Sequence, residues 1–168
     1  DNDGDMDAFV GERFGNIKYF ENISSTSSNT AYVLSSSNSP FGLSDTGNES
    51  NPTFVDIDND GDLDAIIGGL DGLINYFENT SENSTVPAFS LSSSSHPFGL
   101  TDIGLNSAPI FVDIDNDGDF DAFVGEFNGN TNYFENISTS LSSPSFVLAS
   151  SSEPFGIKSI GFQRRSNP

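Results

Sequence analysis

The 168-residue chain has no cysteine and no tryptophan, and it has only one histidine and five basic residues. The absence of cysteine excludes disulfides and thiolate metal sites, although it does not fix the compartment. With 25 acidic residues and a net charge of −20, the chain lacks the basic face that nucleic acids and anionic membrane surfaces require. This charge favours cations as partners and argues against nucleic acid.

Long apolar runs are also missing. No stretch approaches the roughly 20 apolar residues that a membrane helix needs, so no membrane insertion is expected. The sequence starts without methionine or a signal-peptide pattern, inside a repeated motif, and we expect a mature or excised piece of a longer protein. Its 16 phenylalanines and four tyrosines distinguish it from disordered acidic chains, which are poor in aromatic residues.

The sequence contains three tandem repeats, which follow one another at a constant step of 57 residues. The string DNDGD begins at Asp1, Asp58 and Asp115, and the strings GNIKYFEN, GLINYFEN and GNTNYFEN follow it at the same spacing. The predicted repeats are residues 1–57, 58–114 and 115–168. The acidic loops of the second and third repeats begin two residues earlier, at Asp56 and Asp113. The repeats form either one domain or a slice of a longer array.

Each repeat contains about four short stretches with the composition of β-strands. In the second repeat they are rich in aromatic and β-branched side chains, are separated by Gly- and Pro-containing turns, and cover residues 53–56, 64–69, 73–79 and 87–93. Four strands in a unit of this length are typical of a β-propeller blade. We therefore predict an all-β fold of three propeller-type blades, with about four antiparallel strands each. A β-solenoid or a string of small sandwiches is the alternative.

The string DIDNDGDLD, from Asp56 to Asp64, places an aspartate at every second position. Like charges this close repel one another, so the string is unfavourable unless a cation binds. It reads D-x-D-x-D-G-x-x-D when Asp56 is position 1. Ca²⁺ takes about six to eight oxygen ligands, and glycine at position 6 permits the sharp turn that leads the chain around the ion. The pattern therefore predicts a calcium loop.

The expected ligands are four carboxylates in each complete loop and the backbone carbonyl of position 7. The second-repeat set is Asp56, Asp58, Asp60, Asp62 through its carbonyl, and Asp64; the third-repeat set is Asp113, Asp115, Asp117, Asp119 through its carbonyl, and Asp121. The first repeat lacks position 1 and retains only Asp1, Asp3, Asp5 through its carbonyl, and Asp7. The cofactor prediction is thus Ca²⁺ in two complete sites and one partial site, the partial site being weaker or completed by another chain.

Three other interpretations of the loop fit the sequence less well. An EF-hand requires glutamate at position 12 and flanking helices, whereas position 12 is Ile67 or Val124 and the flanks are strand-like. A solvated acidic turn does not explain copies in strict register. Mg²⁺ is the lesser metal alternative, because it demands stricter octahedral geometry and keeps more waters. Bound metal reverses the effect of the repulsion, and its binding energy adds to the folding energy.

These strings resemble the FG-GAP-like, or VCBS-type, repeat family. The resemblance rests on DIDNDGDLDAIIGG from Asp56, on DIDNDGDFDAFVGE from Asp113 and on the NYFEN strings that follow, and it extends over essentially the whole chain. It implies β-propeller blades, as in the calcium-bearing heads of integrin α-subunits, with the aspartate loop joining two strands and binding calcium. Bacterial relatives commonly occur in large secreted or cell-surface proteins.

A closed propeller typically takes about four to eight blades, and three repeats fall short of that number. Three outcomes stay open: a fragment of a larger ring, a ring completed by other chains, and repeats stacked end to end into a fibre. The repeated phenylalanines, among them Phe9, Phe54, Phe111 and Phe123, are expected to pack between blades.

Nothing in the sequence indicates catalysis. The single histidine, His96, has Ser39 and Glu153 at the equivalent positions, and we interpret it as a loop residue. One histidine leaves little for acid–base chemistry, and carboxylates repeated in every unit do not suit a single catalytic pair, so no enzyme is expected. Several asparagines head N-x-Ser/Thr patterns; those in step with the repeat, Asn22, Asn79 and Asn136, are expected to end strands.

The sequence thus predicts a calcium-binding repeat module of a secreted or cell-surface protein with a structural or adhesive role. Its expected partners are calcium, other copies of the repeat in the same or neighbouring chains, and a surface protein or glycan. A subunit of an extracellular filament and a carbohydrate-binding propeller are the alternatives. A polysaccharide-degrading enzyme is a distant third.

Overall fold

The computed structural model describes residues 3–24, 30–36, 38, 40–81, 86–93 and 95–159. These residues form three antiparallel sheets. The first comprises β1 (Ala8–Gly11), β2 (Ile17–Asn22) and β3 (Tyr32–Ser36); the second β4 (Asn51–Val55), β5 (Asp64–Gly68), β6 (Ile74–Asn79) and β7 (Phe89–Ser93); the third β8 (Ala108–Val112), β9 (Asp121–Gly125), β10 (Thr131–Asn136) and β11 (Phe146–Ser152). Short 3₁₀ turns follow the sheets as η1 (Pro40–Gly42), η2 (Pro97–Gly99) and η3 (Pro154–Gly156).

The prediction of an all-β fold is confirmed. Each sheet is a meander in which strands adjacent in the sequence pair with one another. The second and third sheets have the predicted four strands, whereas the described part of the first has three, because the counterpart of β4 would precede residue 1. The sheets begin one strand before the predicted repeat boundaries, since β4 and β8 lie just ahead of residues 58 and 115. No helix in the described ranges is long and apolar enough to cross a membrane.

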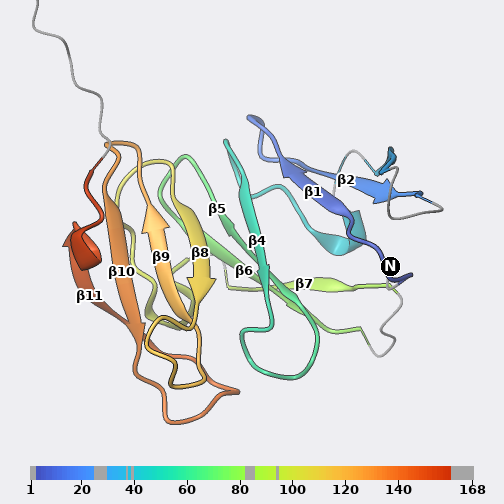
Figure 1. Ribbon diagram of the computed structural model, residues 1–168. Coiled ribbons are helices and arrows are strands. Elements are labelled where there is room, and N and C mark those ends of the chain that lie inside the picture. The colour runs from blue at the N-terminus through green and yellow to red at the C-terminus, as the bar shows by residue number, and fades with distance from the viewer. Residues whose placement is uncertain are drawn as a thin grey trace, which may run out of the picture.

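The three sheets follow one another in chain order, with the second between the first and the third (Figure 1). Their first strands are neighbours, because β1 contacts β4 and β4 contacts β8. Strand β5 lies inside this arrangement, and all five of its residues are buried. That position explains its apolar sequence, AII between Asp64 and Gly68, which does not alternate with polar residues as a strand with one solvated face would.

An apolar cluster fills the space between each pair of sheets. Between the first and second sheets it consists of Ile17, Leu43, Ala65, Ile67, Phe77 and Phe89, with Phe9, Phe41 and Phe54 partly buried against it. The cluster of the second and third sheets contains Val55, Ile57, Ile66, Ile74, Tyr76, Leu100, Ala122, Val124, Phe134 and Phe146, with Phe98, Ile103 and Phe111 packed against it. Phe9, Phe54 and Phe111 thus pack between sheets as predicted. Phe123 instead contacts Tyr133 and Phe155 of its own repeat.

Backbone hydrogen bonds join the repeats at the end of the sheets opposite the acidic loops. The Ser107 amide donates to the carbonyl of Gly69 at 3.0 Å, and the Leu70 amide donates to that of Asn48 at 2.7 Å. The buried Ser107 hydroxyl donates to the carbonyl of Leu73 at 2.9 Å. A Cβ on Gly68 would lie 2.2 Å from the Ser107 carbonyl oxygen, so only glycine permits this approach.

Candidate metal centres

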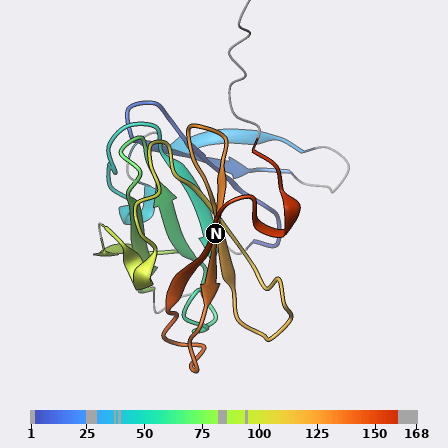
Figure 2. The ribbon, with the colours of Figure 1, turned by 90° about the vertical axis from the view of Figure 1, so that its left-hand side faces the viewer.

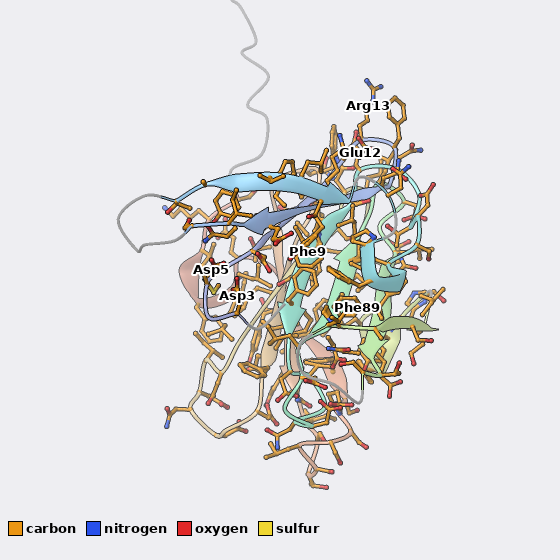
Figure 3. All side chains as sticks on the ribbon, turned by 90° about the vertical axis from the view of Figure 1, so that its right-hand side faces the viewer. Asp3, Asp5, Phe9, Glu12, Arg13 and Phe89 are labelled. Carbon is orange, nitrogen blue, oxygen red and sulfur yellow. The ribbon has the colours of Figure 1, made fainter. Side chains whose placement is uncertain are left out.

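The acidic strings form the loops from β4 to β5 and from β8 to β9, which lie at the lower end of adjacent sheets in Figure 1. In the first repeat the corresponding residues lead into β1. Figure 3 shows Asp3 and Asp5 at the start of that strand, with Glu12 and Arg13 at its other end and Phe9 between them. The topology therefore places the acidic segments of successive repeats at one edge of the structure.

The first three aspartates of each complete loop meet in space. One carboxylate oxygen from each of Asp56, Asp58 and Asp60 lies within 4.8 Å of the other two. The third repeat brings together its equivalents, Asp113, Asp115 and Asp117, to the same extent. Burial and the neighbouring charge of Asp60 raise the pKa of Asp58. Three carboxylates this close could hold a cation, which would remove their mutual repulsion.

Backbone amides hold the loop in this shape. The amides of Asp60 and Gly61 donate to the two carboxylate oxygens of Asp56 at 3.0 and 3.1 Å, and the Asp62 amide donates to Asp60 at 2.9 Å. The third repeat makes the same three bonds at 3.2, 3.2 and 3.1 Å. Gly61 has φ of +100°, which L side chains rarely adopt, so the predicted role of glycine at position 6 is confirmed.

Asp64, at position 9, differs from the three clustered aspartates because it is only 1% exposed. Its Oδ1 accepts the Asn79 amide at 2.8 Å, whereas its buried Oδ2 makes no hydrogen bond of ordinary geometry and interacts only weakly with the Tyr76 hydroxyl. Asp121 repeats this arrangement with the Asn136 amide, and its Oδ2 likewise makes no hydrogen bond of ordinary geometry, with only a weak interaction with the Tyr133 hydroxyl. Burial, followed by the charges of Asp58 and Asp60, raises the pKa of Asp64 to about 7. A buried carboxylate oxygen without an ordinary hydrogen bond is costly unless a cation or a proton neutralises it, so these residues fit a bound cation.

The first repeat departs from this pattern at position 9. Asp7 accepts the Asn22 amide and the Tyr19 hydroxyl, both at 2.8 Å, so each of its oxygens has a hydrogen bond. Burial alone would raise the pKa of Asp7, but these bonds lower it below the usual value. Asp3 is exposed and accepts the Asp5 amide at 3.1 Å, while Asp1 lies outside the described residues. The contrast with Asp64 supports the expectation of a weaker site here.

The asparagines that end β2, β6 and β10 fix the position-9 carboxylate, a role that sequence reasoning missed. Besides its amide bond to Asp64, Asn79 donates from Nδ2 to the Leu63 carbonyl at 3.4 Å and accepts the Ala88 amide at Oδ1. Asn22 and Asn136 make the same bond to Asp7 and Asp121, and all three asparagines are buried. Their predicted place at strand ends is confirmed. The 15-residue spacing from aspartate to asparagine, repeated three times, is the signal that could have revealed the link.

A pH series in the presence of chelator should show greater stability at mildly acidic than at neutral pH. The pKa of Asp64 is about 7 in the folded chain, against about 3.9 when unfolded. Because the folded state holds the proton more tightly, this contribution to stability is fully present below the unfolded pKa and is lost as pH rises through the folded value. The melting temperature should therefore fall between about pH 5 and about pH 8, and less steeply in Asp64→Asn. A melting temperature that rises over this range contradicts the assignment.

The fold and these loops define a class: an all-β repeat protein whose sheets carry acidic clusters suited to a cation. The family model for the FG-GAP-like repeat matches residues 1–67 and 56–124. Each match begins at one acidic string and ends just after the next. The chain belongs to the FG-GAP-like repeat family, so the predicted resemblance is confirmed. No curated protein and no solved structure was found to match it.

Proposed function

We propose that the chain is a calcium-binding repeat module of a secreted or cell-surface protein, with a structural or adhesive role. One recurring observation carries the proposal. In both complete loops, three carboxylates meet within 4.8 Å. Four residues after the last of them lies a buried carboxylate, that of Asp64 or Asp121, with an oxygen that makes no ordinary hydrogen bond. The FG-GAP-like family, whose members are generally structural or binding modules, points the same way.

The residues that would hold the ion in the second repeat are Asp56, Asp58, Asp60 and Asp64, with the carbonyl of Asp62. Bound Ca²⁺ supplies the positive charge that offsets the repulsion among them. The chain itself supplies the shape: Gly61 turns the loop, and Asn79 holds Asp64 against the end of β6. An ion at this point ties the β4–β5 loop to the hairpin of β5 and β6, so its binding energy stabilises the sheet.

In this proposal the three sheets are propeller-type blades. Each blade corresponds to one of the three repeats that follow one another at a step of 57 residues. Two observations support it. Each sheet is a simple meander, and the first strands β1, β4 and β8 lie next to one another, as the inner strands of successive blades do. Calcium modules outside the cell bind with Kd of about 10⁻⁴ to 10⁻³ M, so calcium-rich surroundings would keep such sites filled.

Thermal unfolding of the purified chain in Ca²⁺ and in excess chelator tests the function. A ligand that binds only the folded state adds about 2.7 kcal/mol for each site at a hundredfold excess over Kd. For a chain of this size, that corresponds to a rise of about 5–10 °C in melting temperature for each site. Mg²⁺ at the same concentration should give a smaller rise. Superimposable curves in Ca²⁺ and chelator would show that the loops are not calcium sites.

A further inference from the structure

The two outer faces of the structure correspond to the two halves of an interface that the chain builds twice internally. The internal interfaces are those between the first and second sheets and between the second and third sheets. At each of them, the sheet that comes earlier in the chain contributes one set of residues and the later sheet contributes another. Both sets at the second interface lie 57 residues after their counterparts at the first. The earlier sheet and its following turn supply Ile17 and Leu43, with Phe9 and Phe41 packed beside them, at the first interface. At the second they supply Ile66, Ile74, Tyr76 and Leu100, with Phe98 packed beside them. The later sheet supplies Ala65, Ile67, Phe77 and Phe89, and then Ala122, Val124, Phe134 and Phe146.

The third repeat presents the earlier-sheet set on its outside, where no described segment covers it. This trailing face consists of the exposed Phe155 and Ile157, which lie over Phe123 and Tyr133, themselves only 6% and 8% exposed. Figure 2 views the molecule from the side of the third sheet. Ile157 is 46% exposed, whereas its counterparts Leu43 and Leu100 are each 1% exposed. Thr131, in place of Ile17 and Ile74, is the one polar change in the set.

The aromatic residue of each 3₁₀ turn carries backbone strain that packing offsets in only two of the three repeats. Phe41, Phe98 and Phe155 have φ of +55°, +55° and +52°, which is rare for a bulky side chain. Phe41 and Phe98 are partly buried against the inter-sheet clusters. Phe155 keeps the same conformation and the same contact with its tyrosine, at 4.9 Å between ring centroids, yet it is 68% exposed. Its geometry is that of an interface residue whose partner is not in the described structure.

The glycine after each of these phenylalanines also contacts the following sheet in the first two repeats and no described sheet in the third. A Cβ on Gly42 would lie 2.3 Å from the Phe89 carbonyl oxygen of the following sheet, and a Cβ on Gly99 would lie 2.5 Å from that of Phe146. Around Gly156 no described atom lies within 4 Å of that position. No described strand lies against the third turn in the way that β7 and β11 lie against the first two.

The first sheet presents the matching later-sheet set on its own outer side. This leading face consists of Ala8, Val10, Phe20 and Tyr32, the counterparts of Ala65, Ile67, Phe77 and Phe89. Val10 is 47% and Tyr32 48% exposed, whereas Ile67 and Phe89 are 0% and 7% exposed. In Figure 3 the first sheet, which carries the leading face, lies on the side nearest the viewer.

We propose that the trailing face binds the leading face of a second copy of this chain, head to tail, and so continues the internal interface. The occupant follows from that interface: the surface that covers these positions twice within the chain is another repeat of the same sequence. Because the two faces differ, the contact is heterologous, and each added copy leaves one face of each kind available. This assembly goes beyond the proposed function and does not depend on which cation the loops bind.

Sedimentation velocity over a wide concentration range, in calcium-containing buffer, tests this assembly. The unmodified chain should form species larger than a monomer as concentration rises. Phe155→Ser should weaken that association by about tenfold or more, since aromatic residues dominate such contacts. The matched control is Phe14→Ser, because Phe14 is also 68% exposed but its counterparts in the other repeats are Asp71 and Asn128. A chain that stays monomeric throughout, or equal effects of the two variants, would overturn the proposal.

Mixing two defective variants distinguishes a head-to-tail contact from a symmetric one. Phe155→Ser retains the leading face, and Val10→Asp retains the trailing face, so each should be monomeric alone. Their mixture should form one-to-one dimers and nothing larger, because every dimer has a damaged face at both ends. Thermal unfolding confirms that each variant is folded, and Tyr32→Ser replaces Val10→Asp if that variant is not. A mixture that stays monomeric contradicts the head-to-tail arrangement. Failure of calcium binding would appear in the melting curves alone and leave this result interpretable.

Discussion

Replacing Asp60 and Asp117 with alanine is expected to abolish the calcium-dependent part of the chain's stability. Each residue is one of the three carboxylates that meet in its loop, and each accepts a backbone amide that shapes the loop. Without it, the proposed site loses a charged ligand. The stabilisation of about 2.7 kcal/mol for each site, at a hundredfold excess of Ca²⁺ over Kd, should therefore disappear. In chelator the double variant should unfold close to the unmodified chain, because the repulsion that is removed offsets the lost hydrogen bonds from the Asp62 and Asp119 amides.

Asp62→Ala with Asp119→Ala is the matched control for this experiment. It removes the same number of charges from the same two loops, but position 7 is expected to bind through its carbonyl, which alanine retains. This control should keep most of the calcium-induced rise in melting temperature. Equal losses in the two double variants would mean that Ca²⁺ acts by general screening of the acidic loops and not at defined sites.

Phe77→Ala is expected to cost about 3–5 kcal/mol of unfolding free energy, the range for a large side chain removed from a packed core. Phe77 is fully buried in the cluster between the first and second sheets. Within its own sheet, it lies between Ala65 and Leu91 on the neighbouring strands. The loss is therefore expected to come chiefly from the contact between sheets. Denaturant unfolding measures it.

The first repeat provides the control at Phe20, which occupies the same position. Phe20 also lies between an alanine and a leucine on its neighbouring strands, Ala8 and Leu34, but it is only partly buried. Phe20→Ala should cost much less than Phe77→Ala, because no described sheet covers that ring. Similar losses at the two positions would show that packing between the sheets contributes little to stability.

Local features of the fold followed from the sequence because local spacing determines them. The alternation of aspartates around Gly61 led to the prediction of a turn in which three carboxylates meet, and the structure contains that turn. The strands were predicted to within a few residues from their aromatic and β-branched composition. The first sheet differs, since its described residues form three strands where about four were predicted.

Relations between distant segments did not follow from the sequence. The oxygen of Asp64 that makes no ordinary hydrogen bond depends on burial by the surrounding fold, and the link of Asp64 to Asn79 spans a whole strand and turn. The Ser107 hydroxyl bonds to Leu73, 34 residues earlier, through contacts that no local pattern specifies. Phe123 was expected between sheets together with the other repeated phenylalanines, but it packs against Tyr133 and Phe155 of its own repeat. Composition could not show that its own face has no described neighbour.

The most direct test of calcium binding is a calorimetric titration of Ca²⁺ into the folded, metal-free chain. Two ions are expected to bind per chain at saturation, one for each complete cluster. The heat should be lost in the Asp60→Ala, Asp117→Ala double variant and retained in the Asp62→Ala, Asp119→Ala double variant. An absence of binding heat, or binding that is the same in all three proteins, would contradict the assignment of the acidic loops as calcium sites.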